Sequence, residues 1–224
     1  MQEVRVEMIA IVDYGMGNVG SILNMLGKVG VRATVTANPE ELASASAIIL
    51  PGVGTFDAGM ERLERLDLKK VLDHQALVAR KPILGICLGM QLLTRRSDEG
   101  QKTGLGWIDA ETLSLRGRSG IERLKVPQMG WNQIKRETPH PLFLGLDDAR
   151  YYFVHSYYVQ CDHAADVIAS ADYGGSFAAS IGRDNIVGTQ FHPEKSHKFG
   201  LQLMRNFAEW TSHVQSPRDS LSAA

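Results

Sequence analysis

A cysteine stands between two glycines in the segment Gly85-Ile86-Cys87-Leu88-Gly89, directly after an apolar run. A sharp turn from a buried strand into a helix, with flanking glycines, holds a nucleophile clear of the sheet. The positive end of such a helix favours thiolate, the attacking form of cysteine. The backbone N–H of Leu88 is also suited to stabilise an oxyanion. These residues predict that Cys87 is a nucleophile, and a buried structural cysteine is the alternative.

A thiolate nucleophile needs a proton shuttle, and His192 stands apart among the seven histidines. It follows the strand-like run 186–191, whose carboxyl end would open on the same sheet edge as Cys87. Pro193 turns the chain, and Glu194 follows within reach of the imidazole, where a carboxylate fixes the tautomer and stabilises the imidazolium. Alone, His-Pro-Glu would indicate only a turn. Combined with the cysteine turn, it predicts the catalytic set Cys87, His192 and Glu194.

Two further segments are rich in glycine. Pro51-Gly52-Val53-Gly54 follows an apolar run, and its backbone N–H groups could turn toward a ligand and supply a second oxyanion donor. An ordinary strand-to-helix turn is the alternative for this segment.

The segment 15–20 matches the dinucleotide pattern G-x-G-x-x-G, but no acidic residue stands about 20 positions further on to hold a ribose. We therefore expect its glycines to shape a loop beside Cys87 and not a nicotinamide site.

The composition is that of an ordinary soluble protein, with 224 residues, 44% of them hydrophobic and 22% charged. A net charge of −1 disfavours a nucleic-acid partner. Glu3 and Glu7 interrupt the apolar N-terminal stretch, so we expect no secretion signal. The longest mostly apolar stretch, 82–93, is shorter than the roughly 20 residues that span a bilayer, so we expect no membrane span and a cytoplasmic location. Two cysteines without a Cys-x-x-Cys pair predict neither a disulfide framework nor a zinc site.

The order of apolar runs indicates an α/β fold. Short β-branched runs alternate with helical stretches in the first half, which is typical of a mostly parallel central sheet. Alternating runs in the second half favour added antiparallel strands. We predict a single domain over 1–224, with its core at about 8–213 and a disordered tail at 214–224. Strands are expected at 8–12, 32–36, 45–50 (ended by Pro51-Gly52), 82–86 and 186–191, and helices at 18–29 (with Asn18 as N-cap), 57–64, 68–80 and 204–210.

Five segments carry a resemblance to a known family: PGVGTF, GICLGMQLL, PQMGWN, YYFVHSYYV and GTQFHPEKS. Over about 8–207 the chain resembles class I glutamine amidotransferases, which share GxCxG and HPE. The opening DYGMGN at 13–18, together with PGVG, PQMGWN and HPEKS, is similar to the glutaminase subunits of imidazole glycerol phosphate synthase, from histidine biosynthesis. The resemblance implies a three-layer α/β domain with the nucleophile at the strand-to-helix turn.

The resemblance also implies a reaction. Cys87 attacks the side-chain carboxamide of glutamine to form a thioester, while His192 transfers protons and Glu194 orients it. By similarity, the oxyanion hole consists of Gly52, Val53 and Leu88, and the substrate glutamine is held by Gln91, Glu99, Ser156 and Tyr157. Gln91 lies one helical turn past Cys87 on the same face, which agrees with its role. Glu99 by itself would be only a loop charge.

A partner protein follows from the chemistry of ammonia, which in water mostly becomes ammonium and must pass directly to an acceptor site. The chain has no room for a (β/α)₈ synthase domain of about 250 residues. The resemblance implies that the partner is the cyclase barrel that makes imidazole glycerol phosphate and aminoimidazole carboxamide ribotide. By similarity, the partner faces Asn18, Trp131, Tyr152 and Lys195, and core packing is the alternative for the two aromatic residues. No metal or organic cofactor is expected.

Three other functions stay open. The chain could be the glutaminase of another amidotransferase, such as the one serving pyridoxal phosphate synthesis, but PGVG and PQMGWN disfavour this. A non-catalytic docking module is disfavoured by the complete set Cys87, His192 and Glu194. A cysteine peptidase or thiol-stress protein could use a similar strand-to-helix turn. Release of glutamate from free glutamine would distinguish these functions.

Overall fold

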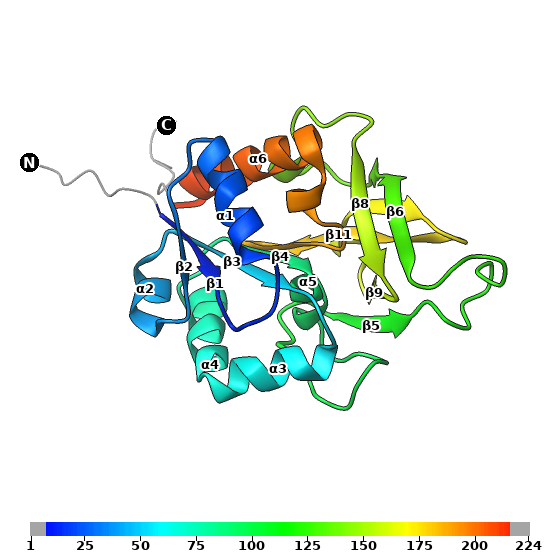
Figure 1. The fold of residues 1–224 in the computed structure, drawn as a ribbon, viewed down its shortest axis with the longest axis horizontal. Helices are drawn as coiled ribbons and strands as arrows, with labels where there is room; N and C mark the ends of the chain where they lie inside the picture. The colour runs from blue at the N-terminus through cyan, green and yellow to red at the C-terminus, as the bar shows by residue number, and fades with distance from the viewer. Residues whose placement is uncertain (1–7, 216–224) are drawn as a thin grey trace, which may run out of the picture.

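The structure of the protein is a computed structural model, and residues 8–215 are described here. A central sheet passes through the molecule between two helical layers (Figure 1). The parallel part of this sheet consists, in spatial order, of β2 (Ala33–Thr36), β1 (Ile9–Val12), β3 (Ala47–Gly52), β4 (Ile83–Cys87) and β12 (Ile186–Thr189). All five carboxyl ends therefore meet at one edge, where catalytic groups of such sheets gather.

Antiparallel strands extend the sheet beyond β12. They are β11 (Ser176–Arg183), β10 (Val167–Asp172) and β7 (Lys135–Arg136), with β9 (Tyr157–Cys161) bridging β11 to β5 (Ala110–Ser114). A separate hairpin-like pair joins β6 (Gln128–Gln133) to β8 (Arg150–His155). The predicted fold class, α/β with a parallel sheet and added antiparallel strands, is confirmed.

The helices cover the two faces of the sheet because side chains alternate along each strand. Ile9 and Ile11 of β1 face one apolar core, which α1 (Val19–Lys28) and α6 (His197–Gln215) cover. Ala10 and Val12 face the second core, on the opposite side of the sheet. That side is covered by α2 (Pro39–Ser44), α3 (Phe56–Arg65), α4 (Leu68–Asp73) and α5 (Leu88–Leu92). Short turns complete the chain: η1 (His74–Val78), η2 (Pro141–Phe143), η3 (Ala164–Asp166) and η4 (Pro193–Lys195).

Several predicted boundaries were wrong. β3 continues through Pro51-Gly52, where a stop was expected, because its pairing with β1 ends at Ile49 and beyond that point only β4 is bonded to it. Proline is tolerated on such a free strand edge. The sequence reading missed α2, although the Asn38 side chain caps it by accepting from the N–H of Glu40 at 2.7 Å.

Helix ends differ as well. Asn18 occupies the N-cap position of α1, but its side chain makes no capping hydrogen bond. The helix predicted at 68–80 is an α-helix followed by a π-helical turn. The last helix begins at His197 and runs to Gln215, inside the predicted tail, whose residues 216–224 lie outside the described part. Between residues 8 and 215, the helices are all too short or too polar to cross a membrane.

Candidate active site

Cys87 is the last residue of β4, and α5 begins at the next residue, Leu88. Its backbone has φ 54° and ψ −108°, a strained conformation for a residue with a Cβ. The glycines beside it allow a close approach of backbones. A Cβ on Gly89 would lie 1.8 Å from the carbonyl oxygen of Leu50, and one on Gly85 would lie 2.8 Å from the Gly89 carbonyl. The turn expected from the sequence is therefore present, and it presents the thiol at the carboxyl edge.

His192 reaches the same edge from β12, which runs parallel to β4 with Thr189 opposite Ile86. The backbone N–H of His192 donates to the carbonyl of Tyr152 at 2.9 Å, which anchors the turn on β8. Its ring Nδ1 lies 2.7 Å from Oε1 of Glu194, and both side chains are only 2% exposed. Because the carboxylate is an acceptor, Nδ1 carries the proton and Nε2 is left with a free lone pair when the ring is neutral.

The electrostatics of His192 fit a proton shuttle. Burial alone would lower its pKa, but the acidic side chains of Cys87 and Glu194 beside the ring outweigh burial and raise the pKa to about 9. The Nε2 atom is buried and makes no hydrogen bond to the residues that the structure describes. This nitrogen is therefore available to exchange a proton with the Cys87 thiol or with a bound substrate.

The two predicted oxyanion donors lie together. Gly52, the last residue of β3, is paired in register with Cys87. A Cβ on Gly52 would come within 2.8 Å of the Leu88 Cβ and 2.9 Å of the Gly89 nitrogen, so β3 and the start of α5 are in close contact. Val53 follows and is 52% exposed. The predicted donor segments thus flank the nucleophile.

The loop after β1 supports this segment. The hydroxyl of Tyr14 donates to the carbonyl of Pro51 at 2.6 Å. Gly17 has φ 108°, and a Cβ on it would lie 3.2 Å from the Gly52 nitrogen. As expected from its glycines, the loop packs beside the site.

The predicted glutamine-binding residues fall into two groups. Gln91 is buried, and its Nε2 donates to the Tyr157 carbonyl at 3.3 Å. Ser156 lies just before Tyr157, between β8 and β9, and its carbonyl accepts from the N–H of Leu115 at 2.9 Å. Glu99 comes from a different loop: one carboxylate oxygen accepts from the Phe56 N–H at 2.8 Å, at the start of α3 and three residues after Val53. Burial raises the pKa of Tyr157, and the nearby Glu99 charge adds to this effect. Burial raises the pKa of Glu99.

Sequence reasoning missed two buried residues of this site. Gln190 is fully buried, and its Nε2 lies 3.8 Å from Sγ of Cys87. His155 has Nδ1 2.8 Å from the Tyr157 carbonyl and Nε2 3.0 Å from the side-chain amide of Gln128. Burial lowers the pKa of His155 to about 4, so its ring is neutral at neutral pH. The sequence offered one indication of Gln190, a side-chain amide in the mostly apolar run 186–191. Such an amide must have hydrogen-bond partners when it is buried.

Three of the four predicted partner-facing residues form one cluster. Trp131 on β6 packs edge-on against Tyr152, with ring centroids 6.4 Å apart, and stacks on His197 at 5.5 Å. The Lys195 ammonium lies 5.8 Å from the centre of the Tyr152 ring. Asn18 precedes α1, which packs against η4, the turn that contains Lys195. Trp131 is 48% exposed, so core packing does not explain it.

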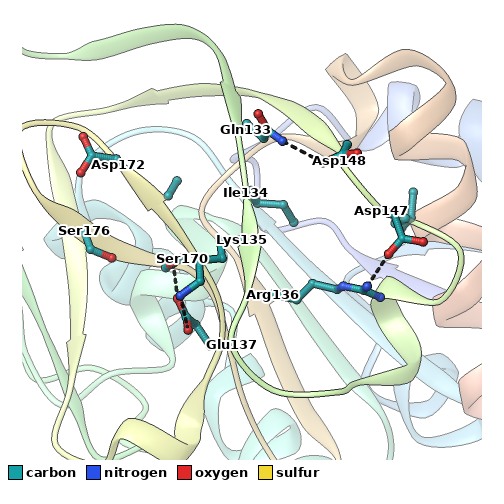
Figure 2. Close-up of a pocket in the computed structure, with 12 residues that line it drawn as sticks. Gln133, Ile134, Lys135, Arg136, Glu137, Asp147, Asp148, Ser170, Asp172 and Ser176 are labelled. Atoms are coloured by element: carbon teal, nitrogen blue, oxygen red, sulfur yellow. Dashed lines mark hydrogen bonds and ion pairs between the residues drawn. The ribbon is translucent and has the colours of Figure 1, made fainter.

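A pocket of about 650 Å³ lies away from these residues, between β7, β10 and the turn before β8 (Figure 2). Two pairs of its polar side chains interact with each other: Arg136 with Asp147, and Glu137 with Ser170 at 2.6 Å. None of the predicted site residues lines it. The catalytic candidates therefore lie at the carboxyl edge of the sheet and not in this pocket.

Residues 10–210 match the family described as glutamine amidotransferase class-I. The chain therefore belongs to the class I glutamine amidotransferase family. It is 48% identical over 203 residues to the imidazole glycerol phosphate synthase subunit HisH 2 of Pseudomonas aeruginosa, covering 90% of this chain and 99% of that one. The corresponding HisH 2 subunit of Methanococcus maripaludis is 48% identical over 201 residues, with 89% and 98% covered. Within the family, the chain groups with the HisH subunits.

Solved structures agree at the level of the fold. A glutamine amidotransferase from Thermotoga maritima superposes with a TM-score of 0.69 at 16% identity, covering 94% of this chain and 99% of that one. PurLQS from the same organism gives 0.71 at 18% identity, with 91% and 98% covered. The three-layer arrangement predicted from the sequence is the arrangement of this family.

Proposed function

We propose that the chain hydrolyses glutamine to glutamate and ammonia as the glutaminase subunit of imidazole glycerol phosphate synthase, in the cytoplasm. The observation that carries this proposal is the convergence of Cys87, His192 and Glu194 at one sheet edge, with the His192–Glu194 pair at 2.7 Å. A non-catalytic docking module would not need a buried carboxylate that holds a buried imidazole beside a thiol.

In the first half of the reaction, the Cys87 thiolate attacks the side-chain carbonyl carbon of glutamine. The carbonyl oxygen becomes an oxyanion, which the N–H of Leu88 and the Gly52–Val53 peptide stabilise. The carbon–nitrogen bond then breaks as the His192 imidazolium gives its proton to the departing nitrogen. Ammonia leaves, and a thioester to Cys87 remains.

In the second half, neutral His192 removes a proton from water, and the resulting hydroxide attacks the thioester. The carbon–sulfur bond breaks, glutamate leaves and the thiolate is restored. Glu194 keeps the proton of His192 on Nδ1 throughout, so that Nε2 is the atom that transfers protons. Gln91, Glu99 and the backbone at 156–157 bind the glutamine in this scheme.

The ammonia passes to a partner, for which the (β/α)₈ cyclase barrel is our proposal. The HisH relatives are named as synthase subunits. In the cluster of Trp131, Tyr152 and Lys195, next to the catalytic turn, Trp131 and Lys195 are exposed and Tyr152 is half-buried. Tyr152 itself accepts the His192 N–H through its carbonyl. A partner docked on this cluster would contact the element that holds the base.

The test is to purify the chain with its cyclase partner and to measure glutamate release and imidazole glycerol phosphate formation. Cys87→Ala should abolish synthesis from glutamine and leave synthesis from added ammonium salt within about twofold of wild type. Loss of both activities, or retention of glutamine-dependent synthesis, would contradict the proposal. Cys161→Ser, at the second free cysteine, is the matched control and should retain both activities.

A further inference from the structure

Gln190 is a buried amide with no role in the mechanism above. It lies in an otherwise apolar run between β12 and His192, and its side chain is completely buried. A buried amide costs free energy unless its donors and acceptor are paired. Its oxygen accepts from Nε2 of Gln91 at 3.1 Å, and its nitrogen lies 3.8 Å from Sγ of Cys87. The amide therefore connects a proposed substrate-binding residue to the nucleophile.

The Tyr157 carbonyl determines which atoms of the two side-chain amides donate and which accept. The Tyr157 carbonyl can only accept hydrogen bonds, so Gln91 must turn its amide nitrogen toward it. The second proton on that nitrogen needs an acceptor, which is Oε1 of Gln190. Gln190 must then turn its own nitrogen, a donor, toward Cys87. The orientation of both amides is fixed by one backbone carbonyl, whose oxygen also lies 2.8 Å from Nδ1 of His155.

Within residues 8–215, Gln190 is the neutral side chain that donates a hydrogen bond to Sγ. The Val154 carbonyl, 4.0 Å from Sγ, can accept a hydrogen bond from the thiol and therefore favours the protonated form. Burial raises the pKa of the Tyr14 hydroxyl, and the nearby Cys87 adds to this effect, but the single proton of that hydroxyl is donated to Pro51. His192 must release and regain its proton during the reaction. Gln190 is left as the donor whose charge and protonation stay constant.

We propose that Gln190 is a further catalytic residue of this site, which donates a hydrogen bond to the Cys87 thiolate and holds the side chain of Gln91 in place. The inference rests on the proposed function. The donor stabilises the thiolate before attack, and again when the carbon–sulfur bond breaks and its electron pair returns to sulfur. Gln190 thus links the binding of glutamine to the charge state of the nucleophile.

The primary test is Gln190→Met, which keeps a similar length and removes both amide atoms. A hydrogen bond to a charged group is worth enough to change a rate by about 10- to 100-fold, and kcat should fall by that factor in the complex with the cyclase partner. The pH midpoint for alkylation of Cys87 by iodoacetamide, followed by peptide mass spectrometry, should rise by about one unit. KM for glutamine should also rise, because the Gln91 amide nitrogen loses one of its two acceptors and keeps only the Tyr157 carbonyl.

A second variant separates the two roles. Gln190→Glu keeps an oxygen acceptor for Gln91 but places a carboxylate where the donor was. Its KM should stay within about threefold of wild type, while kcat falls at least as far as in Gln190→Met. Gln160→Met and Gln160→Glu, at an exposed position of β9, are the matched controls and should leave all three quantities unchanged.

The outcomes are distinct. An unchanged alkylation midpoint in Gln190→Met, or an effect confined to KM, would overturn the proposal. A melting temperature of the variants close to that of the controls shows that the fold is intact. If Gln190→Met does not fold, the alkylation midpoint and kinetics of Gln190→Glu decide. Alkylation of Cys87 needs no glutamine, so failure of the proposed function would appear separately, as absence of glutamate release in the wild-type chain as well.

Discussion

Oε1 of Glu194 accepts a hydrogen bond from Nδ1 of His192 at 2.7 Å, in a setting where neither side chain is more than 2% exposed. Two residues apart in the sequence, they are brought together by the η4 turn, which Pro193 begins. The second carboxylate oxygen and the Nε2 nitrogen make no hydrogen bond within residues 8–215. The pair therefore holds its proton on one ring nitrogen and leaves the other for chemistry.

Replacing Glu194 with glutamine should remove the negative charge while preserving size. Without the carboxylate, the raised pKa of His192, about 9, should shift toward its usual value, which NMR of the ring protons would report. The imidazolium formed during attack would also be less stable, and we expect kcat to fall by about 100-fold. An unchanged pKa of His192 would contradict the electrostatic role assigned to Glu194.

The same pair has a consequence for stability. A histidine whose pKa is higher in the folded state than in the unfolded state stabilises the fold. Its full contribution to the free energy of unfolding is present below the unfolded-state pKa of about 6.5, and it is lost as pH rises through the folded-state pKa. The free energy of unfolding should therefore fall between pH 6.5 and 9 in the wild-type chain. In Glu194→Gln this fall should be smaller. Urea unfolding at the two pH values measures the difference.

His140 should make the fold sensitive to acid. Its Nδ1 accepts from the Leu142 N–H at 3.1 Å, its ring packs against Trp210, and burial lowers its pKa to about 4. When a base has a lower pKa in the folded state than in the unfolded state, the folded protein loses stability as pH falls from about 6.5 toward the folded-state pKa. Allowing for its partial exposure, we expect a loss of about 1 kcal/mol from pH 7.5 to pH 5.

His140→Asn should remove that loss, since asparagine can accept the same N–H and does not titrate in this range. The comparison is the change in unfolding free energy between pH 7.5 and pH 5 for both proteins. His155, whose pKa burial also lowers to about 4, stays in both and gives the remaining acid sensitivity. Equal losses in the two proteins would show that His140 does not contribute.

Gly89→Ala should prevent the turn at Cys87 from forming. The added Cβ would lie 1.8 Å from the carbonyl oxygen of Leu50, a backbone atom of β3 that cannot move without breaking the sheet. We expect a loss of more than about 4 kcal/mol, or no folded protein. Gly27→Ala, in α1, meets no atom within 4 Å and should stabilise by about 0.5–1 kcal/mol. Thermal unfolding of both variants checks this contrast.

Trp131→Ala should weaken the complex with the cyclase partner without unfolding the chain. Exposed aromatic residues at interfaces often carry a large share of the affinity, so Kd should rise by about 10- to 30-fold in calorimetric titration. Val78→Ala is the control: Val78 is 69% exposed, in η1 at the amino-terminal edge of β4. Equal Kd values for the wild type and Trp131→Ala would place the interface elsewhere.

The sequence predicted most of what the sheet edge contains. Cys87 and His192 could be found because each follows an apolar strand and each is flanked by residues that permit only certain turns. The hydrogen bond from the Phe56 N–H to the Glu99 carboxylate could not be predicted, because Glu99 lies in a loop whose sequence has no periodic pattern. Gln190 was missed because a polar residue in an apolar run becomes informative only when its buried partners are known.

Boundaries failed where tertiary contacts overrode local rules. Proline normally ends a central strand, but Pro51 has a neighbouring strand, β4, on one side only, and β3 continues to Gly52. The start of the last helix, at His197, was placed too late because its first turns contain polar and aromatic residues without a clear apolar stripe. Both cases depend on which neighbours the segment meets and not on its own residues.

The parallel pairing of β12 with β4 has a consequence for synthesis of the chain. The strand that completes the sheet beside the nucleophile, and the base that follows it, are among the last elements to leave the ribosome. A nascent or prematurely terminated polypeptide that ends before residue 186 carries Cys87 without its base. Such a truncated chain should therefore release no glutamate from glutamine.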